Sequence, residues 1–115
     1  MIILHGSSRS VFLTRKYAVK IPRMHSWRTF LSGLLSNLNE RQCECLNSAV
    51  LCPIVRSSPY GWYVVMLRAD SIPEGEWDSV RNSDHIADIL RRYNVENKRC
   101  SFGRLDGKVV AVDYG

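Results

Sequence analysis

The sequence lacks the features that mark membrane, secreted and metal-binding proteins. No apolar run approaches the roughly 18–20 residues that a membrane-spanning helix needs, and residues 1–5 have neither a basic leader nor a secretory apolar core. The four cysteines have no CxxC spacing, and the three histidines are not spaced as ligand pairs with them. We therefore expect a cytoplasmic protein with reduced thiols, no zinc site and no membrane association.

The chain also lacks internal repeats, low-complexity tracts and shifts of composition, so we expect one domain over residues 1–115. Its 45% hydrophobic and 23% charged residues are typical of globular proteins. The net charge of +5 comes from basic residues spread from Arg9 to Lys108, with no run longer than two. Such a charge is compatible with nucleic acid, and equally with an acidic protein surface. Nothing in the sequence indicates the oligomeric state.

The first part of the chain predicts strands followed by one long helix. Residues 1–5 and 9–22 are rich in β-branched and aromatic residues, with a hairpin turn at residues 14–16. Residues 25–46 have a helical period, with Ser26 as the N-cap. We expect the helix to face the sheet through an apolar stripe made of Trp27, Phe30, Leu31, Leu34, Leu35 and Leu38.

The second part predicts two hairpins separated by a short helix. Two apolar runs flank the turn at residues 59–61, and Pro53 indicates an edge strand. Residues 71–82, which contain Pro73 and Gly75, are expected to be mostly loop, and residues 84–93 a helix capped by Ser83 or Asp84. Asp106-Gly107 is a strong turn signal for a C-terminal hairpin. The predicted fold is α+β, with an antiparallel sheet of about five strands packed by the long helix.

A lysine in an apolar strand is the first candidate for function. Lys20 lies within Tyr17 to Ile21, where it must face either solvent or an anionic group. In the long helix, Gly33, Asn37, Glu40 and Glu44 are separated by three or four residues and so share one stripe. This stripe can place a glutamate opposite the strand lysine, and we predict that Lys20 and Glu40 lie within salt-bridge distance.

Four stretches occur in an order that belongs to one known family. They are residues 6–11 (GSSRSV), 20–23 (KIPR), 37–40 (NLNE), and 101–115, which runs from Ser-Phe-Gly to Asp-Tyr-Gly. Together the stretches resemble the protein-kinase-like fold, in particular its N-lobe as found in small kinase-like proteins of bacteria and phages. The resemblance implies that Gly6, Ser8, Lys20 and Glu40 bind a nucleotide, that Met66 and Leu67 contact its adenine ring, and that Asp113 binds magnesium.

The departures from the family pattern concern the catalytic groups. The positions of the base and of the second magnesium ligand hold Glu96 and Ser101, no H-R-D sequence occurs, and Arg9 lies near where a final loop glycine is expected. A glutamate base adds a methylene, and a misplacement of about 1 Å can cost about 100-fold in rate. The sequence ends directly after Asp-Tyr-Gly, without the segment that builds a substrate platform in kinases.

Three functions remain open at this point. The first is a catalytically inactive kinase-like protein, encoded by a phage or prophage, that inhibits or redirects a host protein by binding it. Its contact surface would include the aromatic residues of the hairpin, Tyr60, Trp62 and Tyr63. The second is a minimal kinase that binds ATP and Mg²⁺ as cofactors. The third is a basic module associated with nucleic acid.

Overall fold

The computed structural model describes residues 2–6, 8–44, 50–93 and 95–114, which form an α+β fold. The chain divides into two compact units, described here one at a time. The first unit comprises residues 1–47 and 53–68, and the second comprises residues 48–52 and 69–114.

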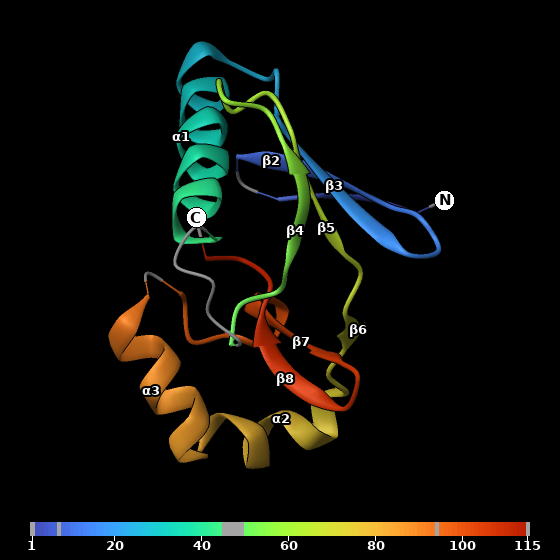
Figure 1. Cartoon of the computed structure of the whole chain (residues 1–115), viewed down its shortest axis with the longest axis vertical. Helices are drawn as coiled ribbons and strands as arrows, with labels where there is room; N and C mark the ends of the chain where they lie inside the picture. The colour runs from blue at the N-terminus through green and yellow to red at the C-terminus, as the bar shows by residue number, and fades with distance from the viewer. Residues whose placement is uncertain (1, 7, 45–49, 94, 115) are drawn as a thin grey trace. The chain divides into compact units, whose positions relative to one another are not determined.

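A five-stranded antiparallel sheet forms the first unit, in the order β1-β2-β3-β5-β4 (Figure 1). Its strands are β1 (Ile2–His5), β2 (Arg9–Leu13), β3 (Tyr17–Pro22), β4 (Ile54–Ser57) and β5 (Val64–Leu67). The predicted turn at residues 14–16 joins β2 to β3, and Thr14 N–H donates to Tyr17 O at 2.9 Å. β4 follows Pro53 and lies at the sheet edge, as expected for a strand that begins next to proline.

The long helix α1 (Trp27–Glu44) packs on one face of this sheet (Figure 1). The predicted N-cap is confirmed, because the Ser26 hydroxyl accepts from Thr29 N–H at 3.2 Å. The prediction for the buried face is correct only in part. Phe30, Leu34 and Leu38 are partly buried, and Leu34 and Leu38 lie against Gly61 of the β4–β5 hairpin, but Trp27, Leu31 and Leu35 are 81%, 52% and 60% exposed. Among the described residues of α1, the buried ones are Gly33, Asn37 and Glu40, and the two polar residues are stable there because they pair with other buried polar groups.

Close approach of α1 to the sheet depends on Gly33. A Cβ atom at this position would lie 2.5 Å from Ser8 O and 2.8 Å from the Cα of Pro22. The buried apolar side chains of the sheet include Ala18, Val64 and Met66, on the same face as Lys20. A helix residue without a side chain therefore brings α1 to the distance at which longer polar side chains can reach the strands.

The second unit contains a three-stranded antiparallel sheet and two short helices (Figure 1). The strands are β6 (Asp70–Ser71), β7 (Phe102–Leu105) and β8 (Lys108–Ala111), and a 3₁₀ turn at Arg99–Ser101 precedes β7. The predicted Asp-Gly turn joins β7 to β8, with φ of 53° at Asp106 and 78° at Gly107, as a type I′ turn requires.

The helices of the second unit are α2 (Glu74–Arg81) and α3 (Asp84–Arg92). The second is the predicted helix, and Ser83 caps it by accepting from Ile86 N–H at 3.4 Å. The first corrects the prediction of a loop over residues 71–82. Proline before the first turn and acidic residues within it favour a helix start, and they outweigh the single glycine at position 75. Trp77 of α2 packs on Phe102, with ring centroids 5.6 Å apart.

Candidate functional site

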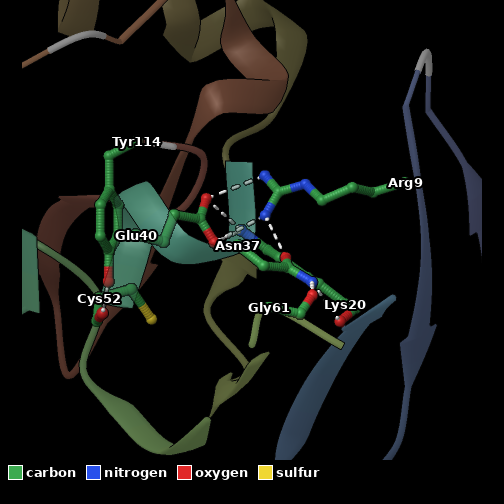
Figure 2. Close-up of polar contacts among 7 residues, drawn as sticks. All are labelled: Arg9, Lys20, Asn37, Glu40, Cys52, Gly61 and Tyr114. Atoms are coloured by element: carbon green, nitrogen blue, oxygen red, sulfur yellow. Dashed lines mark hydrogen bonds and ion pairs between the residues drawn. The ribbon is translucent and has the colours of Figure 1, made fainter. Parts of the chain in front are cut away.

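A buried group of charged side chains lies between α1 and the sheet of the first unit. We call Arg9, Lys20, Asn37 and Glu40 the Glu40 cluster (Figure 2). Lys20 Nζ lies 3.1 and 3.0 Å from Oε1 and Oε2 of Glu40, so the predicted pair is present. Arg9 donates from Nη1 and Nη2 to the same two oxygens, at 2.8 and 2.9 Å. Both oxygens of Glu40 thus accept from two cations.

Each member of the Glu40 cluster is positioned by regular structure. Lys20 lies in the middle of the sheet, opposite Val11 of β2 and Val64 of β5. Arg9 is the first residue of β2, and Asn37 and Glu40 follow one another by one turn on α1. All four side chains are at least nine-tenths buried. Burial of the cluster therefore follows from the close packing of α1 that Gly33 permits.

Asn37 connects the cluster to the β4–β5 hairpin. Its Oδ1 accepts from Arg9 Nη1 at 2.9 Å, and its Nδ2 donates to the carbonyl oxygen of Gly61 at 2.8 Å. Figure 2 shows these contacts converging from the strands, the helix and the hairpin. The amide is therefore satisfied on both sides, and the cluster joins α1 to β2, β3 and the hairpin.

Glu40 stays ionised at neutral pH. Burial on its own raises the pKa of this carboxyl, but the charges of Lys20 and Arg9 and their hydrogen bonds outweigh burial, so the pKa lies below its ordinary value. The Glu40 carboxylate accepts four charge-assisted hydrogen bonds, and these offset the free-energy cost of removing its charge from water. The arrangement is thus suited to holding the fold together, and it also presents a lysine–glutamate pair.

The remaining nucleotide-binding candidates of the first unit lie in turns and in the core. Gly6 N–H donates to Arg9 O at 2.8 Å, and Ser8 O accepts from Arg23 N–H at 2.9 Å. Met66 is buried on the same face of the sheet as Lys20, and Leu67 N–H donates to Pro53 O at 3.1 Å. Their contact with a nucleotide stays a prediction.

The predicted metal-binding and catalytic residues belong to the second unit. Val112 and Asp113 donate their N–H groups to Ser101 O at 2.9 and 3.4 Å. The Ser101 hydroxyl is fully buried, and no described residue offers it a hydrogen-bond partner. Ser101 and Asp113 are thus neighbours through their backbones. Because Ser101 is fully buried, its hydroxyl is not accessible to a metal ion in solvent. Magnesium binding by Asp113 stays a prediction.

Glu96 lies at the surface of the second unit. Its carboxylate is 76% exposed and forms an ion pair with Lys98 at 2.9 Å, and that hydrogen bond is the main cause of a raised pKa at Lys98. Tyr114 is buried and donates its hydroxyl to Cys52 O at 2.8 Å, so the tyrosine of the Asp-Tyr-Gly stretch has a structural contact. A base role for Glu96 has no support in these contacts.

Large apolar side chains are exposed on α1 and on the β4–β5 hairpin of the first unit. The helix contributes Trp27, Leu31 and Leu35, and the hairpin contributes Tyr60 and Trp62, which are 76% and 51% exposed. Phe30 joins the two parts, because its ring lies 6.1 Å from that of Trp27 and 5.3 Å from that of Trp62. The sequence prediction assigned the helix residues to the core, so it missed this surface. Tyr63, the third aromatic candidate, is only partly exposed.

Charge is divided unevenly between the two units, a second feature that sequence analysis missed. The first unit holds nine Lys or Arg against two Asp or Glu, a formal charge of +7, and the second holds seven against nine, a charge of −2. Residues 1–39 contain no acidic residue at all. Counting acidic residues along the chain, in addition to basic ones, would have shown this division.

No group of three His, Cys, Asp or Glu that could hold a metal ion occurs among the described residues. Within the same part of the chain, no helix is long and apolar enough to cross a membrane. No protein-family model matches this chain, and comparison with curated proteins finds no similar sequence.

Proposed function

We propose that this protein is a kinase-like domain that transfers no phosphate and acts by binding another protein through the outer side of α1 and the β4–β5 hairpin. The observation that carries the proposal is the exposure of large apolar side chains there, with Trp27 at 81% and Leu35 at 60%. Groups of exposed large apolar side chains are typical of protein-binding sites, and tryptophan and tyrosine are enriched among the residues that dominate binding energy.

The relationship to the kinase N-lobe is supported by the order of the elements and by the ion pair. Strands β1 to β3, one long helix and the β4–β5 hairpin follow one another in the order that the resemblance implies. Within this arrangement a lysine of β3 meets a glutamate of α1. By the same resemblance, the protein is a phage or prophage product that binds a host protein in the host cytoplasm.

The absence of phosphoryl transfer is supported by the state of the candidate catalytic groups. Phosphoryl transfer depends on cations and metal ions positioned around the phosphates. Here the carboxylate of Glu40 holds Arg9 as well as Lys20, and the arginine comes from the strand that follows the phosphate-binding turn in kinases. Glu96 is paired with Lys98 at the surface, and the Ser101 hydroxyl is fully buried.

A minimal kinase that binds ATP and Mg²⁺ is the second candidate. One specific observation favours it: Lys20 and Glu40 form the ion pair that active kinases require. Under this alternative, Lys20 would also contact the phosphates and Asp113 would hold the metal ion.

Phosphorylation assays separate these two functions. We expect the wild-type protein, incubated with labelled ATP, Mg²⁺ or Mn²⁺ and a bacterial lysate, to give no phosphorylated product above that of a Lys20→Met variant. We also expect ATP with Mg²⁺ to leave the melting temperature unchanged, because a ligand that binds the folded state would raise it. Because Lys20 is buried, the folding of the variant is checked by circular dichroism, and Asp113→Asn serves as a second control. Phosphorylation that depends on Lys20 or Asp113 would establish the minimal kinase instead.

A further inference from the structure

The exposed residues of α1 form a continuous ridge. Trp27, Leu31 and Leu35 are spaced by four residues, so their side chains follow one another along a single line on the helix surface. At a rise of about 1.5 Å per residue, the line is about 12 Å long. Rows spaced by four residues are the rows through which helices pack into the grooves of other helices. The shape of the ridge therefore fits a second helix lying across α1.

The exposed charged side chains that the structure describes in the first unit have one sign. Arg28 is exposed and lies three residues before Leu31, which makes it a neighbour of the ridge on the helix surface. Arg41 in the last turn and Arg56 on β4 are exposed as well. Among the described side chains of the first unit, the acidic one is Glu40, and it is fully buried between Arg9 and Lys20. A partner with acidic flanks would thus meet an attractive potential and no exposed acidic side chain that the structure describes.

The aliphatic side chains of the ridge favour a protein over a nucleic acid as the partner. Leu31 and Leu35 gain free energy by contacting other apolar side chains, which a phosphate backbone does not offer. The exposed cations of this unit lie in the β2–β3 turn (Arg15 and Lys16), on α1 (Arg28 and Arg41) and on β4 (Arg56). The two on α1 lie near opposite ends of the helix, so they do not form a stripe that could follow a nucleic-acid backbone.

We infer that the ridge of Trp27, Leu31 and Leu35 binds an acidic amphipathic helix of a partner protein. This inference rests on the proposed function and adds the class of the partner. The apolar face of the bound helix lies on the ridge and on the ring of Trp62, and its Asp or Glu residues face Arg28. Apolar contact provides the binding energy, and charge selects among helices.

A peptide display selection tests the class of helix that the ridge binds. The library consists of amphipathic helices that share a fixed leucine face and carry randomised flanking positions. Selection uses the wild-type protein. Counter-selection uses two single variants in parallel, Leu31→Asp and Leu35→Asp. Both positions are more than half exposed, so the variants should fold. Ser32→Asp is the matched control, because it adds the same charge at an exposed position beside the ridge.

We expect the selected peptides to be enriched in Asp and Glu. Their affinity should fall on the order of 10-fold or more for each ridge variant and less than about 2-fold for Ser32→Asp. Arg28→Glu should reduce the preference for acidic over basic peptides.

Each other outcome contradicts a different step. Ridge-dependent peptides with neutral or basic flanks would overturn the acidic class and leave the protein-binding function in place. Selected peptides that bind the ridge variants as well as the wild type would overturn both the acidic class and the protein-binding function. A selection that yields no peptides would overturn both as well. Ridge-dependent binding of a labelled single-stranded oligonucleotide at the same salt concentration would replace the protein partner by nucleic acid.

Discussion

Replacing Glu40 by glutamine should lower the free energy of unfolding by about 3–5 kcal/mol, because it leaves two cations buried without their carboxylate. Arg9 and Lys20 both donate to Glu40, and their side chains are 9% and 6% exposed. A domain of this size has a total stability of about 5–15 kcal/mol, so the variant should be severely destabilised. Denaturant unfolding followed by circular dichroism measures the change.

Glu96→Gln is the matched control for this prediction. It removes the same charge from an exposed ion pair with Lys98, and such pairs contribute less than about 1 kcal/mol. If Glu40→Gln costs as little as Glu96→Gln, the Glu40 cluster does not hold the first unit together.

The stability of the wild type and that of Glu40→Gln should depend differently on pH. The pKa of Glu40 is lowered from 4.5 in the folded state, so the unfolded chain binds the proton more readily. The carboxylate therefore stabilises the fold above pH 4.5, and this stabilisation is lost as the pH falls through the folded pKa. The difference between wild type and Glu40→Gln should be constant near neutral pH and shrink in acid.

Replacing Gly33 by alanine should destabilise the protein by about 1–3 kcal/mol, although alanine is the better helix former. The new Cβ would overlap backbone atoms, Ser8 O at 2.5 Å and Pro22 Cα at 2.8 Å, which cannot rotate away. Relief would move α1 away from the strands and stretch the hydrogen bonds of Glu40. Thermal or denaturant unfolding detects the loss.

Gly75→Ala gives the comparison for Gly33→Ala. Gly75 also lies in a helix, α2, but a Cβ there meets no atom within 4 Å. We expect this substitution to be neutral or to stabilise by up to about 1 kcal/mol, through helix propensity alone. Equal effects at the two positions would mean that α1 does not approach the sheet as closely as described.

Local signals in the sequence predicted most of the elements. Ser26 and Ser83 cap the helices that they were expected to cap, and Asp106-Gly107 forms the expected turn. The pairing of Lys20 with Glu40 followed from a helical stripe and from the cost of leaving a lysine unpaired inside an apolar strand. These features depend on few neighbours along the chain, which is why sequence alone could place them.

The buried face of α1 could not be predicted in the same way. Periodicity assumes that the apolar side of a helix faces the core, but here the polar stripe of Asn37 and Glu40 does so. That arrangement is stable because cations from two strands compensate the charge of the carboxylate. The sequence pattern identifies Arg9 only as a departure from the glycine of a phosphate-binding loop and does not indicate that it pairs with Glu40. Long-range pairing of this kind is decided by tertiary contacts, which the local pattern does not contain.

Side-chain NMR of Lys20 and Arg9 tests the central claim most directly, namely that these cations stabilise the fold and do not carry a nucleotide. The ¹⁵N–¹H signals of a buried ammonium and guanidinium bound to a carboxylate are protected from exchange with water, so both should be visible at neutral pH. We expect the two signals to keep their positions when ATP and Mg²⁺ are added in millimolar excess. A shift of the Lys20 signal that saturates with ATP, and that Asp113→Asn removes, would contradict the claim and show that the lysine binds phosphate.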